Sequence, residues 1–442
     1  MSAPRRLMGH NFPKRVLPMP SHLYLAIRWV LLSSFALIIA RETIAEERVT
    51  GPWEVEQLHK APEFTWEKGG GLVRSLLYAG ENHRGRGTRV FAYYASPATL
   101  NGDSQGENVI HKKYPGVVLV HGGGGTAFRQ WAELWAKRGY AAIAMDLAGH
   151  RPLEGKPSRE PLPDGGPDQS DLTKFGHLDE LVTEHWPYHA VANVIRGHSL
   201  LRSFPEVDAD KTAVTGISWG GYLTCIVASL DDRFKAAVPV YGCGFLHENS
   251  YWVAPNFEKM TPANRERWVT LYDPSRYLGQ CRVPILFVNG TNDFAYPLDS
   301  YMKSYQLVPG EKNIRVTVNM PHGHEAGWEP LEIGAFIDQH LLGTSPLPKI
   351  TNVRLEENGD VIAEILPPDG RYRTNLAFTK ETGPINQRKW TSAEATSDSS
   401  TIRIPRPPQE TTAWFLNVTD AHGWTTSSEV RISPKSDDRT DR

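Results

Sequence analysis

Short, uninterrupted apolar runs alternate with longer amphipathic stretches over most of the chain. Runs of this kind, bounded by glycine or polar residues, are typical of strands buried on both faces of a parallel sheet. We expect such strands at residues 115–121, 139–146, 211–214, 234–242, 283–290 and 314–319. Stretches with apolar residues at helical spacing lie between them, and helices are expected over 127–138, 186–204, 223–230 and 331–342. Strands that alternate with helices predict an α/β fold, with a mostly parallel sheet and helices on both faces.

The beginning of the chain has a different pattern. Residues 1–28 include basic side chains and no acidic one, and residues 29–40 carry no charge. This apolar run is about a dozen residues long, whereas a membrane-spanning helix needs roughly 20. A basic lead, a short apolar run and small residues near Ala40 and Ala45 predict a signal peptide over 1–45, with an uncleaved membrane anchor as the alternative. We therefore expect a secreted or periplasmic protein that has no membrane contact after signal cleavage.

The catalytic domain is expected over residues 46–345. Near its start, residues 71–78 and 88–95 are β-favouring runs joined by a polar, glycine-bearing segment, which predicts a hairpin. Residues 150–180 are rich in proline, glycine and charge. This composition predicts a long loop insertion that forms no core and shapes the substrate site.

The pattern changes again after Pro348. Residues 349–433 contain short alternating runs without a helical period, and Asn358-Gly359-Asp360 has the composition of a hairpin turn. The runs lie at 350–356, 361–366, 375–380, 401–404, 413–418 and 429–432. The region resembles immunoglobulin or fibronectin type III modules, so a small β-sandwich accessory domain is expected. Residues 434–442 are expected to be a disordered, charged tail.

Composition narrows the classes of function. The chain has 442 residues, 40% of them hydrophobic and 22% charged, which is ordinary for a globular protein of two or three domains. A formal net charge of −2 leaves no basic excess to neutralise phosphates, so no nucleic-acid partner is expected. Three cysteines are too few for a disulfide scaffold; Cys225 is expected to be a small buried residue, and one disulfide among the three is left open. No spacing of Cys, His or acidic residues indicates zinc, so neither a metal nor a cofactor is expected, and the oligomeric state is left open.

The most informative stretch is Gly216-Ile217-Ser218-Trp219-Gly220, between an expected strand and an expected helix. A serine hydroxyl can act as a nucleophile when it projects from a sharp turn, where flanking side chains would collide with neighbouring backbone. The helix that follows directs N–H groups at the same place. The five-residue pattern alone also fits an ordinary tight turn. With its flanking elements, the stretch resembles the nucleophile elbow of the α/β-hydrolases, which implies that Ser218 is the nucleophile.

Four consecutive glycines, Gly122 to Gly125, follow His121 at the end of an expected core strand. Glycines leave the backbone N–H groups open to a substrate oxygen, although a flexible loop is the alternative. The run resembles the His-Gly-Gly-Gly oxyanion element of esterases and lipases, in which the histidine is structural. The resemblance implies an oxyanion hole formed by the N–H of Trp219 together with that of Gly123 or Gly124.

An acid and a histidine follow Ser218 in the order used by this superfamily. Asp293 comes directly after one expected core strand, and His324 comes shortly after the next. Because the carboxyl ends of parallel strands meet at one edge of a sheet, we expect the three side chains to converge. His324 would then deprotonate Ser218, and Asp293 would hold the histidine ring in the correct tautomer.

Each of these two assignments has a competitor. His324-Glu325-Ala326-Gly327 resembles the His-Glu-Gly-Gly run around the catalytic histidine of the acetyl xylan esterase and cephalosporin C deacetylase family, which favours His324 over His322. Asp293 is preferred to Asp299 because it follows its strand directly.

Aromatic residues flank the expected triad. Phe294, Tyr296 and Trp328, together with His322, are candidates to line an acyl or sugar pocket, and the aromatic side chains could equally belong to the core.

These features predict a secreted serine esterase that acts through an acyl-enzyme, on an acetyl or similar ester of a small molecule or polysaccharide. A peptidase similar to prolyl oligopeptidase is the main alternative, although the residues before the glycine run are too few for the β-propeller that such enzymes usually carry. Dienelactone hydrolases are a third relative, but their nucleophile is a cysteine. A binding or adhesion protein with an inactive hydrolase fold is the remote alternative.

Overall fold

The computed structural model describes residues 48–69, 71–102, 113–153, 158–367, 370–395, 397–398, 400–405 and 407–433. The predicted signal peptide and charged tail lie outside these residues. Within the described part of the chain, no helix has both the length and the apolar character needed to cross a bilayer.

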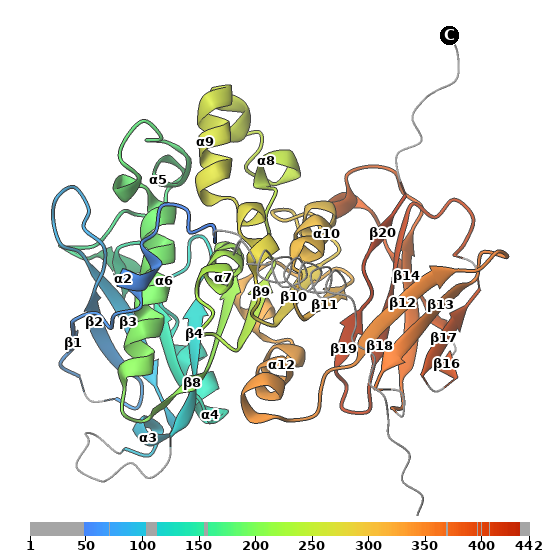
Figure 1. Ribbon diagram of the computed structural model, residues 1–442, viewed down its shortest axis with the longest axis horizontal. Coiled ribbons are helices and arrows are strands. Elements are labelled where there is room, and N and C mark those ends of the chain that lie inside the picture. Colours follow the sequence, from blue (N-terminus) through green and yellow to red (C-terminus); the bar gives the residue numbers. More distant parts are fainter. Residues whose placement is uncertain are drawn as a thin grey trace, which may run out of the picture. The chain divides into compact units, whose positions relative to one another are not determined.

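A nine-stranded sheet forms the main element of the fold, with the order β1-β2-β3-β5-β4-β8-β9-β10-β11 (Figure 1). Its strands are β1 (Phe64–Trp66), β2 (Arg74–Ala79), β3 (Arg89–Ala95), β4 (Tyr114–Val120), β5 (Ala141–Met145), β8 (Val207–Ile217), β9 (Ala236–Val240), β10 (Ile285–Gly290) and β11 (Lys312–Thr317). The six strands from β5 to β11 in this order are parallel, and β1, β2 and β3 are antiparallel. Both the predicted parallel sheet and the predicted hairpin are confirmed.

Helices cover both faces of this sheet. The long ones are α4 (Arg129–Lys137), α6 (Trp186–Ser203), α7 (Trp219–Leu230), α9 (Pro262–Tyr272), α10 (Leu298–Leu307) and α12 (Leu331–Leu342). Helices α6 and α7 contact each other and the central strands. Tyr140, just after α4, donates a hydrogen bond to Asp338 of α12. The predicted helices are confirmed to within two residues at each end, with α7 beginning earlier, directly after Ser218.

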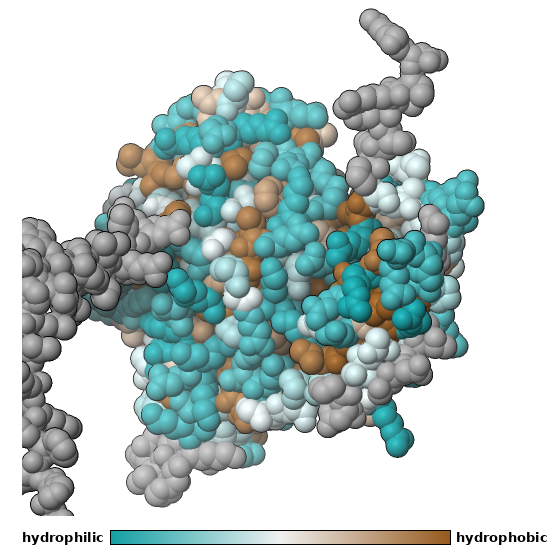
Figure 2. Space-filling model, turned by 45° about the vertical axis from the view of Figure 1, so that its right-hand side comes forward, coloured by the Kyte–Doolittle hydropathy of each residue, from teal (hydrophilic) through white to brown (hydrophobic). Residues whose placement is uncertain are grey.

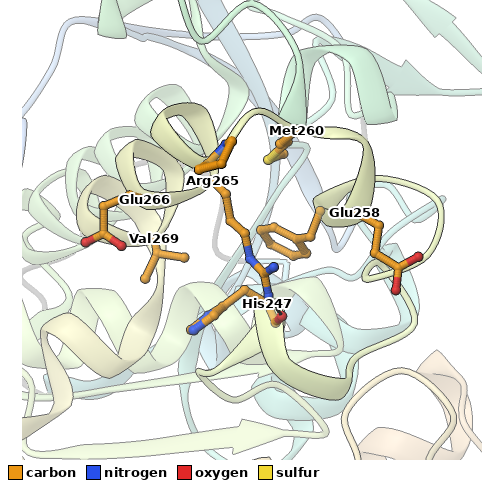
Figure 3. A pocket seen from close by; sticks show the side chains of 8 residues that line it. His247, Glu258, Met260, Arg265, Glu266 and Val269 are labelled. Atoms are coloured by element: carbon orange, nitrogen blue, oxygen red, sulfur yellow. Dashed lines mark hydrogen bonds between the residues drawn. The ribbon is translucent and has the colours of Figure 1, made fainter.

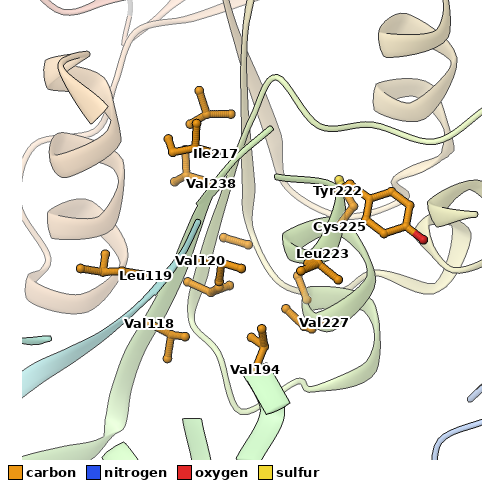
Figure 4. Packing of buried hydrophobic residues seen from close by; sticks show 14 of the residues in the cluster. Val118, Leu119, Val120, Val194, Ile217, Tyr222, Leu223, Cys225, Val227 and Val238 are labelled. Atoms are coloured by element: carbon orange, nitrogen blue, oxygen red, sulfur yellow. The ribbon is translucent and has the colours of Figure 1, made fainter. Parts of the chain in front are cut away.

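The core lies between the sheet and its helices. Figure 4 shows side chains of β4 and β8 packed against Val194 of α6 and against Leu223 and Val227 of α7. Val118, Val120 and Ile217 are fully buried, as expected for strands that are covered on both faces. This packing makes the carboxyl end of β8, where Ser218 follows, a rigid support.

The segment over 150–180 differs from its prediction. It contains β6 (His150–Pro152), β7 (Arg159–Pro161) and α5 (Asp171–Phe175), and Phe175 and Leu178 belong to the main hydrophobic core. The expectation that this segment forms no core is therefore wrong. Phe175 lies against Trp219 and Trp268, with ring centroids 5.8 Å and 5.3 Å away, and these aromatic contacts anchor a segment whose sequence is otherwise polar.

Short helices complete the described residues between 48 and 348. They are α2 (Val55–Leu58), α3 (Pro97–Leu100), α8 (Leu246–Asn249) and α11 (His324–Trp328), with the 3₁₀ turns η1 (Val182–Glu184), η2 (Phe257–Lys259), η3 (Pro274–Arg276) and η4 (Leu278–Gln280). The cysteines at positions 225, 243 and 281 are all buried and none forms a disulfide, so the disulfide left open by the sequence is absent.

The C-terminal region consists of two small antiparallel sheets, as its alternating pattern predicts. One has the order β12-β13-β17-β16, and the other contains β15, β14, β18, β19 and β20. The strands are β12 (Lys349–Leu355), β13 (Val361–Leu366), β14 (Arg373–Thr379), β15 (Thr391–Ala395), β16 (Ser397–Asp398), β17 (Thr401–Ile404), β18 (Ala413–Thr419), β19 (Thr425–Ser427) and β20 (Arg431–Ile432), with the turn η5 (Ile385–Gln387). Residues from both sheets share one hydrophobic cluster, which includes Val361, Leu376, Ile402 and Leu416. This is the arrangement of a β-sandwich.

On the face drawn in Figure 2, hydrophilic residues predominate and hydrophobic residues occur in small groups. Isolated apolar residues on a surface are usual for globular proteins, and this face gives no functional signal of its own.

Candidate active site

Ser218 occupies the sharp turn between β8 and α7. Its φ of +57° and ψ of −114° are rare for a residue with a side chain, and such strained positions occur where the surrounding structure enforces them. The two neighbouring glycines show what enforces this one. A Cβ added at Gly216 would lie 2.2 Å from the Gly220 carbonyl oxygen, and one at Gly220 would lie 2.0 Å from that of Val120. Only glycine fits at either position.

A chain of hydrogen bonds links Ser218, His322 and Asp293. His322 Nε2 lies 3.0 Å from Ser218 Oγ, and His322 Nδ1 lies 2.7 Å from Asp293 Oδ2. The other carboxylate oxygen of Asp293 accepts the backbone N–H groups of Ala295 and Tyr296 at 2.9 Å and 2.8 Å. Because both oxygens are engaged and the side chain is 2% exposed, Asp293 holds the histidine ring in one orientation.

The expectation that His324 reaches Ser218 is wrong, and His322 takes that position. His324 is the first residue of α11, and its Nε2 accepts the N–H of Gly122 at 2.9 Å. Burial lowers the pKa of His324 to about 3, so its ring is neutral at physiological pH and this acceptor persists. The turn after β11 explains why His322 takes this position. Strand β11 ends at Thr317, and the turn through Asn319, with a φ of +56°, directs His322 to the sheet edge.

Tyr241 is a site residue that sequence reasoning missed. Its ring stacks on that of His322 with centroids 4.4 Å apart, and its hydroxyl donates to the Pro321 carbonyl oxygen at 2.7 Å. Tyr241 therefore supports the loop that carries His322. Tyr241 follows strand β9 directly, at the carboxyl edge of the sheet, and this position in the sequence could have indicated a site residue.

The glycine run lies beside Ser218 and Trp219. A Cβ added at Gly122 would lie 3.0 Å from Ser218 Cβ, and one at Gly123 would lie 2.8 Å from Trp219 Cδ1. In the described part of the chain, the N–H groups of Gly123, Gly124 and Trp219 donate to no protein acceptor. These N–H groups are consequently available to an external oxygen, whereas the N–H of Gly122 is bonded to His324.

His121 has a structural contact. Its buried ring accepts the N–H of Leu147 at Nε2, at 2.8 Å, and this bond connects the glycine run to the loop after β5.

The predicted pocket residues have different surroundings. Phe294 is 52% exposed and lies 5.0 Å from His322 between ring centroids. Trp328 is half-buried against Phe128 and Trp131. Tyr296 is fully buried, which agrees with the alternative that this side chain belongs to the core. Asp299 lies on α10, where its side chain accepts the N–H of Ser300.

The fully buried hydroxyl of Tyr296 has no hydrogen bond of ordinary geometry among the described residues. Burial raises its pKa well above the usual value, and the nearby side chain of Ser218 acts in the opposite direction. The phenol is therefore neutral and lies close to Ser218.

A separate pocket of about 370 Å³ lies between α8 and α9 (Figure 3). Arg265 reaches across it and donates to the His247 carbonyl oxygen. The residues around it are His247, Phe257, Glu258, Met260, Pro262, Arg265, Glu266 and Val269. None of the predicted site residues lines this pocket. Among the residues described, no group of three or more His, Cys, Asp or Glu side chains is placed to hold a metal ion.

Residues 105–320 match the model of the dienelactone hydrolase family. The chain belongs to the α/β-hydrolase superfamily. The matched residues include Ser218 and Asp293.

Two curated proteins and one solved structure are similar to this α/β-hydrolase. An uncharacterized peptidase, YuxL, from Bacillus subtilis is 23% identical over 246 residues, which are 52% of this chain and 31% of that protein. Acetyl esterase Axe7A from Xylanibacter ruminicola is 22% identical over 223 residues, which are 46% of this chain and 48% of that protein. The chain thus spans 31% of the length of the first relative and 48% of the second. The acetyl xylan esterase structure from Paenibacillus sp. R4 has a TM-score of 0.51 and 21% identity, and the match covers 65% of this chain and 92% of that one; at this identity the likeness shows the fold alone.

Proposed function

We propose that this hydrolase cleaves carboxylic esters through an acyl-enzyme formed on Ser218. The observation that carries the proposal is the hydrogen-bonded chain from Ser218 through His322 to Asp293. An imidazole in contact with both a serine hydroxyl and a carboxylate can remove the serine proton and is stabilised by the carboxylate when it becomes charged.

The proposed reaction has two halves. In the first, His322 accepts the Ser218 proton, the serine oxygen attacks the ester carbonyl, and His322 returns the proton to the departing alcohol. In the second, His322 deprotonates a water molecule that attacks the acyl-serine, the bond between the acyl carbon and Ser218 Oγ breaks, and His322 returns the proton to Oγ as the acid is released. The N–H groups of Trp219 and of Gly123 or Gly124 would bind the oxyanion, and the loss of one such donor typically lowers kcat by about 10²–10³.

An acetyl ester is the favoured substrate. The similarity to an acetyl esterase supports this choice. The predicted signal peptide and the β-sandwich suit an extracellular polysaccharide. N-terminal sequencing of the exported protein tests the location: cleavage near residue 45 is expected, and an intact N-terminus in the membrane fraction would favour the uncleaved anchor.

A peptidase is the second candidate, because one of the similar curated proteins is a peptidase. Hydrolysis of 4-nitrophenyl acetate is compared with that of dipeptide 4-nitroanilides, for the wild type and for Ser218→Ala. Ser392→Ala, at an exposed serine of β15, is the matched control. We expect ester cleavage to exceed amide cleavage and to be lost only in Ser218→Ala; faster amide cleavage would favour the peptidase.

The same variants test for an inactive hydrolase fold. Equal rates for the wild type and Ser218→Ala would show that Ser218 is not a nucleophile and would leave a binding role. Incubation with a fluorophosphonate, followed by mass spectrometry, should place the label on the peptide that contains Ser218.

A further inference from the structure

The hydroxyl of Tyr296 is a buried polar group that the reaction described above does not use. Its side chain is fully buried, and its oxygen has no hydrogen bond of ordinary geometry to a described residue. Most buried polar groups in proteins are hydrogen-bonded, and a buried group without a partner destabilises the folded state. An exception of this kind, close to Ser218, needs an explanation in terms of function.

The backbone of Tyr296 is held by the residue that also orients His322. The N–H of Tyr296 donates to Asp293 Oδ1 at 2.8 Å, and its carbonyl oxygen accepts the side-chain amide of Asn289 at 2.9 Å. The other oxygen of the Asp293 carboxylate lies 2.7 Å from His322 Nδ1. Tyr296 and His322 therefore share one support, and both side chains lie close to Ser218.

Aromatic contacts hold the ring of Tyr296. Its centroid lies 5.2 Å from that of Trp252, and the Trp252 centroid lies 4.6 Å from that of Trp219, the residue after Ser218. Because the ring is fully buried among these side chains, its hydroxyl stays beside Ser218 without a hydrogen bond that fixes it there. A donor placed in advance needs no reorganisation at the moment of reaction.

The charge on the serine oxygen changes during the proposed reaction, whereas the phenol stays a donor. Burial raises the pKa of Tyr296 well above its usual value, so the phenol keeps its proton at physiological pH. In the resting enzyme, the neutral Ser218 hydroxyl lies 3.0 Å from His322 Nε2. When His322 takes the serine proton, Oγ becomes negatively charged, and hydrogen bonds to a charged oxygen are roughly twice as strong as neutral ones.

We propose that the Tyr296 hydroxyl donates a hydrogen bond to Ser218 Oγ only while this oxygen carries negative charge. The inference rests on the proposed function. In the first half of that reaction, Oγ gains charge as its O–H bond breaks and loses it as the bond to the acyl carbon forms. In the second half, Oγ gains charge again as this bond breaks, until His322 returns the proton. The phenol keeps its own proton throughout and stabilises both transition states.

Tyr296→Phe tests the proposal, because it removes the hydroxyl and keeps the ring. An interaction made only in the transition state raises kcat without changing substrate binding. We therefore expect kcat and kcat/KM for 4-nitrophenyl acetate to fall equally in the variant, by about 10- to 100-fold, with KM unchanged. The midpoint of urea denaturation should not fall. The matched control is Tyr301→Phe, at a fully buried tyrosine of α10 whose hydroxyl donates to the Val288 carbonyl oxygen, and its kcat should be unchanged.

A second comparison distinguishes a bond to Oγ from a bond to the oxyanion of the substrate. Sulfur is a weak hydrogen-bond acceptor, and a cysteine ionises more readily than a serine. In a Ser218→Cys background, Tyr296→Phe should therefore change the rate constant of the 4-nitrophenol burst by less than about twofold. The burst measures the attack on the ester even when turnover is slow.

An unchanged kcat in Tyr296→Phe, in an enzyme that Ser218→Ala inactivates, would overturn this inference alone. Equal losses in the serine and cysteine backgrounds would also overturn it, because the hydroxyl would then act on the substrate oxyanion. A Tyr296→Phe protein that is less stable or does not fold would show that the bond is present in the resting enzyme, against the proposal. If Ser218→Ala cleaves the ester as fast as the wild type, the proposed function fails instead, so the two failures are distinguishable.

Discussion

At the scale of single residues, the candidate active site depends on two histidines that are two positions apart and have opposite roles. His322 bonds to Ser218 and Asp293, whereas His324 accepts the N–H of Gly122 and thereby holds the glycine run. Under the proposed function, His322 would contact the reacting atoms, and His324 would position the loop that supplies the oxyanion donors.

Substitution separates the two roles. His322→Gln should lower kcat for 4-nitrophenyl acetate by at least about 10³. His324→Ala should lower kcat by about tenfold with little change in KM, because the glycine run loses its anchor. His324→Gln should recover most of the activity, since glutamine can still accept the N–H of Gly122. Loss of activity in His324→Gln together with an active His322→Gln would return the role of base to His324.

A second prediction at this scale concerns two fully buried tyrosines. The hydroxyl of Tyr296 lies near Ser218 but has no hydrogen bond of ordinary geometry to a described residue, whereas that of Tyr301 donates to the Val288 carbonyl oxygen at 2.8 Å. Urea denaturation should show Tyr296→Phe to be as stable as the wild type or more stable by about 1 kcal/mol, and Tyr301→Phe to be less stable by about 1 kcal/mol. A destabilised Tyr296→Phe would mean that the hydroxyl bonds to Ser218 after all.

At the scale of elements, the junction of β8 and α7 determines whether the site can exist. The helix begins directly after Ser218, and the backbone of Gly220 lies against the carbonyl oxygen of Val120 on the neighbouring strand β4. This close approach brings the end of β8 and the glycine run after β4 together, so the nucleophile and the N–H donors share one support.

Gly220→Ala tests this junction. Its added Cβ would lie 2.0 Å from backbone atoms that cannot move aside, so we expect a loss of several kcal/mol in the free energy of unfolding, or no soluble protein. Gly279→Ala is the control, because a Cβ there would meet nothing within 4 Å; its stability should change by less than about 1 kcal/mol. Circular dichroism during urea denaturation measures both, and equal stabilities would contradict the proposed constraint.

At the scale of the whole molecule, the C-terminal sandwich is bonded to the edge of the nine-stranded sheet. The N–H of Val316 in β11 donates to Ser427 Oγ at 2.8 Å, and the N–H of Thr425 donates to Glu332 Oε1 at 2.6 Å. An uncovered edge strand can pair with another molecule. By covering β11, strand β19 protects the last strand before the loop that carries His322.

Buried histidines make the stability of the molecule depend on pH. His198 is fully buried against Phe234, lies 2.7 Å from Asp231 and 2.8 Å from Thr212, and has Arg202 and Arg233 nearby. Burial lowers its pKa from 6.5 to about 4, although the charge of Asp231 opposes this. Between pH 6.5 and about 4 the unfolded chain binds a proton that the folded chain excludes, so stability falls as the pH falls.

We expect His198 to contribute a loss on the order of 3 kcal/mol in the free energy of unfolding between pH 7 and pH 4. Urea denaturation at several pH values measures this loss. In His198→Gln, the slope of the free energy of unfolding against pH should fall by the amount that corresponds to about one bound proton. A slope that is the same in the variant and in the wild type would show that His198 titrates alike in both states.

Much of the fold could be predicted because the governing interactions are local in sequence. The buried strands have continuous apolar runs, and the turn at Ser218 needs glycine at positions 216 and 220, so both are visible in the order of the residues. The segment at 150–180 was misjudged because Phe175 packs against Trp219 and Trp268, which are distant in the chain. No local pattern contains a contact of that kind.

The sequence by itself determined the parallel sheet, the turn at Ser218, the glycine run and the place of Asp293 at the end of its strand, because each depends on residues next to one another or on the order of strands. Only the tertiary structure decided between His322 and His324 as the partner of Ser218 and revealed the support from Tyr241. These features depend on the direction in which a side chain leaves a loop and on which distant loop meets it, and both are set by the packing of the whole fold.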